Sequence, residues 1–206
     1  MTSQIPTPMT PDEALSILKQ GNAHYVGGNP VRPHLTGAER RAMLATEQRP
    51  FCVLVGCSDS RVSPELLFGR GLGELFIVRN AGNVVDLAAM GSIEYGVAVL
   101  GAPLIVVLGH ERCGAVQAAV DVVEKDATYP GSIGQMIEPI IPAVLRARRE
   151  GSHDLLDRSV RGNVARIVER LRTTEQMLIE PQRAGRRRIV GARYDLDDGT
   201  VEFFEN

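Results

Sequence analysis

Four short apolar runs constrain the fold of this 206-residue chain more than any other feature. Each run is rich in Val and Ile, and none shows the strict polar–apolar alternation of a strand with one face in solvent. That pattern is typical of parallel strands covered by helices on both faces. The runs are FCVLVGC (51–57), ELFIVRN (74–80), PLIVVLGH (103–110) and RIVGARYDL (188–196).

Segments with helical patterns separate these runs, at 63–71, at 86–100 and over most of 113–180. Strands that alternate with helices indicate an α/β protein with a parallel sheet. After the fourth run, Asp198-Gly199 is a hairpin turn signal inside LDDGTVEFF. We therefore expect a mostly parallel central β-sheet of four parallel strands plus a C-terminal antiparallel edge strand, flanked by helices.

The N-terminal part is expected to hold a loose arm and two helices. Residues 1–10 contain prolines and no periodicity, and a helix is expected to begin near Thr10 and end near Gly27. A second, short helix fits 36–48, with Thr36 as its cap. The apolar stripe of the first helix has no obvious partner within the chain. We expect one domain over 1–206, with the arm and helices at 1–48 and an α/β core at 49–206.

Composition narrows the range of partners and locations. The net charge of −2 gives no reason to expect nucleic acid or an anionic membrane as a partner. No apolar run approaches the ~18 residues of a membrane span, and no signal-peptide pattern opens the chain, so a cytoplasmic protein is expected. Three cysteines are few and odd in number, which favours free thiols or metal ligands over a disulfide framework.

The first and third runs end in residues that bind metals. Cys57 ends the first run, His110 ends the third, and Cys113 follows three residues later. Ligands of parallel α/β sheets bind beyond the carboxyl ends of the strands, so these side chains should meet at one edge. Two thiolates and one imidazole suit Zn²⁺, and a three-residue ligand set leaves the fourth tetrahedral position for water or substrate. Cys113 also falls at a helix start, which favours the thiolate.

Asp59 and Arg61 lie just after Cys57 and are close enough in sequence to form a charge-assisted pair. An ordinary salt bridge within a loop is one interpretation. The other is that Asp59 reaches the open zinc position, where it accepts a hydrogen bond from bound water or becomes a ligand itself. Arg61 would then decide between these states by holding Asp59 away from the metal.

Four motifs together are similar to the signature blocks of the β-class carbonic anhydrases, in the bacterial branch of that family. They are CSDSR (57–61), VRNAGN (78–83), GSIEYGVAVLG (91–101) and GHERCG (109–114). The resemblance implies one Zn²⁺ per subunit on Cys57, His110 and Cys113, with Asp59 and Arg61 as a catalytic dyad. It also implies dimers, often paired into tetramers, in which the N-terminal helices extend onto the partner subunit.

The activity implied is the hydration of CO2 to bicarbonate by hydroxide formed on the zinc. Val62 and the segment at 84–90 are expected to wall the CO2 pocket, and the backbone N–H of Gly114 is a candidate donor to a substrate oxygen. At low pH Asp59 should occupy the zinc and close the site, and at higher pH it should return to Arg61.

The chain departs from the family pattern at two places. The plant-like branch has a substrate-binding glutamine where this chain has Gly71, which favours the bacterial branch. Some bacterial members also bind inhibitory bicarbonate through a Trp, an Arg and a Tyr. Arg79 and Tyr194 match the last two, but Leu54 stands at the Trp position and the chain contains no Trp. Arg79 and Tyr194 are equally compatible with a plain contact at the strand ends.

Two other functions fit the same ligand set. One is the hydrolysis of carbonyl sulfide or carbon disulfide, which relatives of the family perform. The other belongs to a different class, a structural zinc protein with Asp59 as fourth ligand or a thiol redox sensor. A redox sensor would need a resolving thiol, and Cys52 is expected to point to the opposite face of its strand from Cys57.

Overall fold

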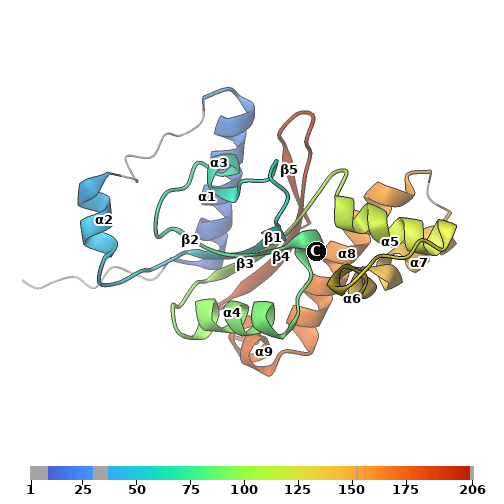
Figure 1. Ribbon diagram of the computed structural model, residues 1–206. Helices are drawn as coiled ribbons and strands as arrows, with labels where there is room; N and C mark the ends of the chain where they lie inside the picture. Colours follow the sequence, from blue (N-terminus) through green and yellow to red (C-terminus); the bar gives the residue numbers. More distant parts are fainter. Residues whose placement is uncertain (1–8, 30–36, 152, 205–206) are drawn as a thin grey trace, which may run out of the picture.

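The computed structural model describes residues 9–29, 37–151 and 153–204. Its centre is a five-stranded sheet with the strand order β2-β1-β3-β4-β5 (Figure 1). β1 pairs in parallel with β2 and β3, β3 pairs in parallel with β4, and β5 lies antiparallel to β4. The strands are β1 (Cys52–Cys57), β2 (Leu75–Asn80), β3 (Leu104–His110), β4 (Arg188–Tyr194) and β5 (Val201–Phe204). This confirms the α/β class and the mostly parallel sheet.

The strands are the four predicted apolar runs, shortened by one or two residues at their ends. Every residue of β1 and β3 is buried, as expected for central strands with helices on both sides. The hairpin between β4 and β5 turns at Asp198-Gly199, where Gly199 has a φ of 80°, a value that favours glycine. The predicted antiparallel edge strand is thus confirmed.

Helices cover both faces of the sheet (Figure 1). They are α1 (Pro11–Val26), α2 (Ala38–Leu44), α3 (Pro64–Leu67), α4 (Leu87–Ala98), α5 (Gly114–Lys125), α6 (Ser132–Ile137), α7 (Ile141–Arg149), α8 (Leu155–Thr173) and α9 (Gln176–Arg183), with 3-10 turns η1 (Ala81–Asn83) and η2 (Glu138–Ile140). Apolar side chains of α4, α8 and α9 pack on one face, and those of α1 and α3 on the other. Within the described ranges, none of these helices is both long and apolar enough to span a bilayer.

The expectation that α1 lacks a partner in its own chain is wrong. Ala14, Leu15 and Leu18 of α1 are buried in the same cluster as the side chains of β1, β3 and β4. The side chain of Asn22 also joins α1 to the β4–β5 hairpin, donating to the carbonyl of Gly199 at 2.9 Å and accepting from the N–H of Val201 at 2.8 Å. The sequence pattern showed the apolar stripe but not the surface that receives it.

The second helix is shorter than predicted and differs at its cap. α2 begins at Ala38 with Gly37 as N-cap, and none of its residues is buried. The predicted cap, Thr36, and most of the predicted arm at 1–10 lie outside the described residues. α2 contacts the loop before β2, where the guanidinium of Arg40 donates to the carbonyl of Leu72 at 3.0 Å.

A third group of apolar side chains lies beyond the carboxyl ends of β1 and β3. It joins α5, α7 and the start of α8, and it includes Cys57, Val84 and Cys113. The helices that follow β3 therefore pack against Cys57 and Cys113, two of the residues that the sequence predicts as metal ligands.

Replacing Gly21 with Ala should destabilise the fold, because a Cβ at this position would lie 2.0 Å from the carbonyl oxygen of Phe68. Overpacking of this kind costs about 1–3 kcal/mol of unfolding free energy. The matched control is Gly91→Ala, in α4, where a Cβ meets nothing within 4 Å and helix propensity should add up to about 1 kcal/mol. Urea unfolding measures both, and a Gly21→Ala variant as stable as wild type would contradict this packing of α1.

Candidate metal centre

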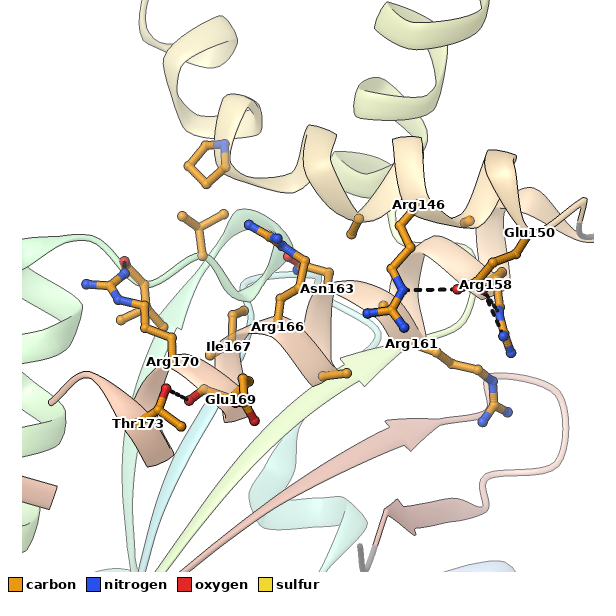
Figure 2. A pocket seen from close by; sticks show the side chains of 17 residues that line it. Arg146, Glu150, Arg158, Arg161, Asn163, Arg166, Ile167, Glu169, Arg170 and Thr173 are labelled. Atoms are coloured by element: carbon orange, nitrogen blue, oxygen red, sulfur yellow. Dashed lines mark hydrogen bonds and ion pairs between the residues drawn. The ribbon is translucent and has the colours of Figure 1, made fainter. Parts of the chain in front are cut away.

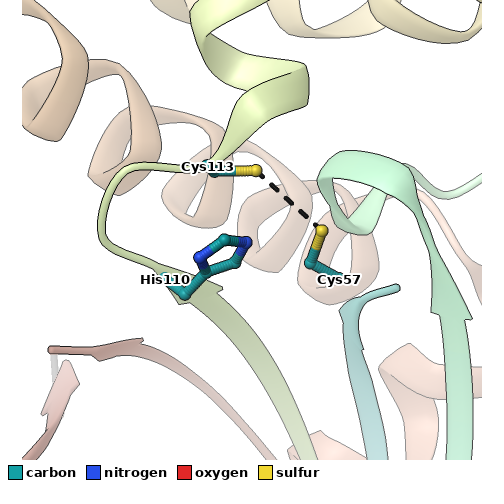
Figure 3. Close-up of side chains that lie close together, drawn as sticks. All are labelled: Cys57, His110 and Cys113. Carbon is teal, nitrogen blue, oxygen red and sulfur yellow. Dashed lines mark hydrogen bonds between the residues drawn. The ribbon is translucent and has the colours of Figure 1, made fainter. Parts of the chain in front are cut away.

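Three potential ligands converge where two neighbouring parallel strands end (Figure 3). Cys57 is the last residue of β1, His110 is the last residue of β3, and Cys113 is the N-cap of α5. All three side chains are buried, and their donor atoms lie within 4.8 Å of one another. The predicted meeting of these residues at one edge of the sheet is confirmed.

The spacing of the three donor atoms fits a tetrahedral zinc ion. The Sγ atoms of Cys57 and Cys113 are 3.9 Å apart, and two thiolates on one tetrahedral zinc, each at about 2.3 Å, lie about 3.8 Å apart. Nδ1 of His110 is 2.8 Å from the carbonyl oxygen of Glu111, so this nitrogen carries the proton and Nε2 is left with a lone pair. Among the described residues, buried Nε2 has no hydrogen-bond partner, as expected of a metal ligand.

A sulfur–sulfur hydrogen bond couples the two thiols. The hydrogen bond with Cys113, aided by the N–H of Gly82 at 3.3 Å from Sγ, lowers the pKa of Cys57 to about 4. The same sulfur–sulfur contact raises the pKa of Cys113. A divalent cation would replace the hydrogen-bonded proton and hold both sulfurs as thiolates. Cys52 is different, since burial raises its pKa and it packs on the face of the sheet that α1 covers.

Asp59 and Arg61 form a bidentate ion pair beside the ligands. The guanidinium of Arg61 donates to both carboxylate oxygens of Asp59, at 2.9 and 2.7 Å, and the N–H of Arg61 also donates to Oδ1 at 2.9 Å. These bonds hold the pKa of Asp59 well below its usual range. Oδ2 of Asp59 is only 3.8 Å from Nε2 of His110. The carboxylate is thus bound to Arg61 while lying next to the ligand set.

The loop that carries this pair is anchored by Arg79, at the end of β2. Its guanidinium donates to the backbone carbonyls of Cys57 at 2.8 Å, Asp59 at 2.9 Å and Val62 at 2.7 Å. Tyr194, which the resemblance groups with Arg79, lies on β4, and two strands, β1 and β3, separate β4 from β2. Its side chain packs in the cluster that includes α1, where burial raises its pKa. Arg79 here positions the ligand loop, and no contact between the two side chains is present among the described residues.

The two predicted substrate contacts are placed differently. Gly114 is the first residue of α5, next to Cys113. A Cβ added to Gly114 would have no neighbour within 4 Å. Val62 is 1% exposed and packs with Leu54 in the cluster on the α1 face, so it does not belong to the apolar group that surrounds the ligands. Val84, from the other predicted wall segment, does belong to that group.

Sequence reasoning missed several contacts around the site. Arg112 has a φ of 50°, and its carbonyl accepts from Arg61 at 3.3 Å, so the loop between His110 and Cys113 also supports the ion pair. Asn163 of α8 donates to the carbonyl of Gly82 at 3.1 Å, behind the turn that bonds Cys57. The VRNAGN motif contains this turn, but its sequence does not predict the hydrogen bond from Gly82 to the sulfur of Cys57.

A second group of acidic side chains lies nearby, made by Glu111, Asp195 and Asp197. Arg112 pairs with Asp197 at 2.6 Å, and Arg193 pairs with Asp195 at 2.9 Å. These ion pairs offset much of the negative charge of the group and tie the ligand loop to the β4–β5 hairpin. We therefore assign the group a structural role.

Comparison with known proteins agrees with this geometry. Residues 52–201 match the family model described as carbonic anhydrase. A carbonic anhydrase of Mycolicibacterium smegmatis is 43% identical over 192 residues, covering 93% of this chain and 92% of the relative.

The chain belongs to the β-carbonic anhydrase family. Among solved structures of β-carbonic anhydrases, one from Aspergillus fumigatus superimposes with a TM-score of 0.70 at 26% identity, covering 94% of this chain and 90% of that one. A second, from a study of two tetrameric enzymes of Sordaria macrospora, superimposes with a TM-score of 0.72 at 23% identity, covering 95% of this chain and 96% of that one. The chain is a carbonic anhydrase with a Cys57–His110–Cys113 cluster able to hold a metal.

Replacing Arg79 with Met should loosen the loop 57–62, because three carbonyls lose a charged donor. Losing even one such bond corresponds to about tenfold in an opening equilibrium. Hydrogen exchange of the amides of 58–62 should accelerate by at least about that factor. Arg149→Met, on the exposed end of α7, is the control. Equal exchange in wild type and Arg79→Met would show that Arg79 does not anchor the loop.

Proposed function

We propose that this chain catalyses the reversible hydration of CO2 to bicarbonate and a proton, with one Zn²⁺ per subunit. The observation that carries the proposal is the buried set of Cys57, His110 and Cys113, whose donor atoms lie within 4.8 Å of one another. When bound by three such ligands, zinc supplies a fourth position at which water loses its proton near neutral pH and becomes a nucleophile. The side chains around the set position the reactants.

Asp59 is the residue that can orient a group at the fourth position. Its pKa lies far below neutrality, so it is an anion throughout the physiological range and can only accept hydrogen bonds. While Arg61 holds it, Asp59 remains a hydrogen-bond acceptor beside the ligands and leaves the fourth position to solvent. If it leaves Arg61, the same carboxylate is near enough to occupy that position and close the site.

The pH dependence of this gate follows from competition for one position. Asp59 does not change charge between pH 6.5 and 9, so its own protonation does not move the gate. Hydroxide becomes tenfold more abundant with each pH unit, so with zinc held by Cys57, His110 and Cys113 it would compete better with the carboxylate for the fourth position as pH rises. We infer that the closed arrangement prevails at low pH and the Asp59–Arg61 pair at high pH.

The surroundings of the ligands support the binding of a small, largely apolar substrate. Val84 packs against the ligand group, and the backbone N–H of Gly114 is a plausible donor to a substrate oxygen. Val62 supports the loop from the opposite face and is a weaker candidate for the CO2 wall.

Other chemistries are less well supported. The carbonic anhydrase relative at 43% identity favours CO2 over carbonyl sulfide or carbon disulfide as substrate. A structural zinc site normally has four fixed ligands, whereas Asp59 is bonded to Arg61. A thiol sensor needs a resolving cysteine, and Cys52 lies on the opposite face of β1 from Cys57.

We also propose self-association to a dimer or tetramer, in the cytoplasm. β2 is an edge strand, and beside it lie Leu87 of α4 and Val99, the C-cap residue of α4, which are 89% and 64% exposed. Apolar side chains this exposed beside an unpaired strand edge are typical of a contact between subunits. α2 buries no residue within the chain and is the better candidate of the two N-terminal helices to extend onto a partner.

CO2 hydration by the zinc-loaded protein should rise with pH between 6.5 and 9. In wild type we expect a rise of about tenfold per pH unit on the acidic side of the profile, because a single displacement governs the gate. Stopped-flow measurements with a pH indicator test this, and a flat profile would refute the gate.

Variants of the dyad separate the gate from other causes of pH dependence. Arg61→Gln should move the midpoint of the profile to higher pH, because Asp59 loses the partner that keeps it away from the ligands. Asp59→Asn should lower the rate at high pH by about tenfold or more, since a hydrogen-bond acceptor next to the reacting groups is lost. The control is Asp12→Asn, because Asp12 lies on α1 and forms an ion pair with Arg188 of β4. An Arg61→Gln profile identical to wild type would contradict the assigned role.

A further inference from the structure

A groove of about 890 Å³ lies between α7 and α8 (Figure 2), and Val84 and Val85 are among the residues that line it. Neither the metal ligands nor Asp59 and Arg61 line it. The proposed CO2 chemistry makes no use of this groove, which is large enough for a small organic molecule.

The groove has small residues, Gly162 and Ala143, in its middle and cationic side chains on either side of them. Arg158, Gly162, Arg166 and Arg170 recur every four residues along α8, so they form one stripe on its surface. Gly162 lies against α7, since a Cβ added there would be 3.6 Å from the Cβ of Ala143. The small residues leave the middle of the stripe open. Arg158 and Arg166, on either side of Gly162, are about 12 Å apart along the helix.

Two sites of net positive charge, here called poles, remain in the groove once each arginine is matched with its carboxylate partners. At one end Arg146 and Arg158 share a single carboxylate, Glu150, at 3.0 and 2.9 Å, which leaves an excess of one positive charge. At the other end Arg166 is exposed and forms no ion pair or side-chain hydrogen bond with any described residue. Figure 2 shows Arg166 extending toward α7.

The remaining charges of the groove are balanced or turned away. Arg161 pairs with Asp157 and Glu202, and Arg170 pairs with Glu175. Glu169 is the other carboxylate of the lining, and Figure 2 shows it on the Thr173 side, pointing away from Arg166. The Arg166 pole is therefore not cancelled by its neighbour on the helix.

We propose that this groove binds a small molecule with two separated anionic groups, phosphates or carboxylates. One group would contact Arg166, the other the Arg146–Arg158 end, and the body of the molecule would lie over Gly162 and Ala143. Guanidinium groups suit both anions, because their planar donors form paired hydrogen bonds with either. A single anion would reach only one pole and bind more weakly.

Hydrogen bonds connect the lining of the groove to the segment beside the metal centre. Asn163, on the groove wall, donates to the carbonyl of Gly82, whose own N–H donates to Sγ of Cys57. Arg170 donates to the carbonyl of Val85 at 2.8 Å. A bound molecule would therefore lie against the segment that supports a metal ligand, without touching the ligand itself.

Isothermal titration of the zinc-loaded protein at low ionic strength tests the proposal. The probes are fructose 1,6-bisphosphate for two phosphates, glutarate for two carboxylates, and inorganic phosphate for a single anion. We expect a dissociation constant below about 1 mM for at least one divalent probe, and weaker binding of inorganic phosphate. The preferred probe identifies the class of anion.

Charge variants place the binding in the groove. Arg166→Gln should weaken binding of the divalent probe by about tenfold. Glu150→Gln should strengthen it, because Arg146 and Arg158 lose their shared carboxylate. Arg183→Gln, the same charge change on α9, should have no effect. Thermal unfolding of each variant shows that the fold is kept.

Two results would overturn the proposal. One is the absence of binding by any divalent probe, as expected if a subunit contact fills the groove. The other is equal binding by wild type and Arg166→Gln, which would place the anion at the metal centre or elsewhere. Both results leave the CO2 activity of the protein unaffected, so the two proposals fail separately.

Discussion

The convergence of two sulfurs and one imidazole at the end of the sheet is the arrangement on which the rest of the site depends. It exists because β1 and β3 pair in parallel and in register, with Gly56 opposite Leu108, so that Cys57 and His110 leave the sheet side by side. The turn after β3 then brings Cys113 to the start of α5. Buried polar groups are costly to leave unpaired, and a divalent cation bound by these three residues would remove that cost.

The parts of the chain around this centre act mainly on the loop that holds Asp59. Arg61 fixes the carboxylate, Arg79 fixes three carbonyls of the loop, and the carbonyl of Arg112 supports Arg61. One strand, β2, and the loop that follows β3 therefore support the loop that follows β1, and the two loops are joined by the hydrogen bond between Arg61 and the carbonyl of Arg112. These bonds define one position of the Asp59 carboxylate, and the proposed gate would require a second defined position at the metal.

The sequence predicted the sheet and the convergence of Cys57, His110 and Cys113, for physical reasons. Strands buried on both faces leave a strong apolar signal, and Cys and His at the ends of two of them restrict the chemistry to soft metals. The docking of α1 could not be predicted, because it depends on a close approach between Gly21 and the backbone of Phe68. Arg79 was matched to a bicarbonate site by resemblance, whereas its guanidinium lies among carbonyls at the end of β1 and in the loop that follows it. An arginine reaches many acceptors, and only the three-dimensional arrangement selects one.

X-ray absorption spectroscopy at the zinc edge of the purified protein tests the central claim most directly. The account predicts one zinc per chain, with two sulfur ligands at about 2.3 Å and one imidazole nitrogen at about 2.0 Å, completed by an oxygen. Protein that folds and hydrates CO2 without zinc, or zinc that lacks sulfur ligands, would contradict it.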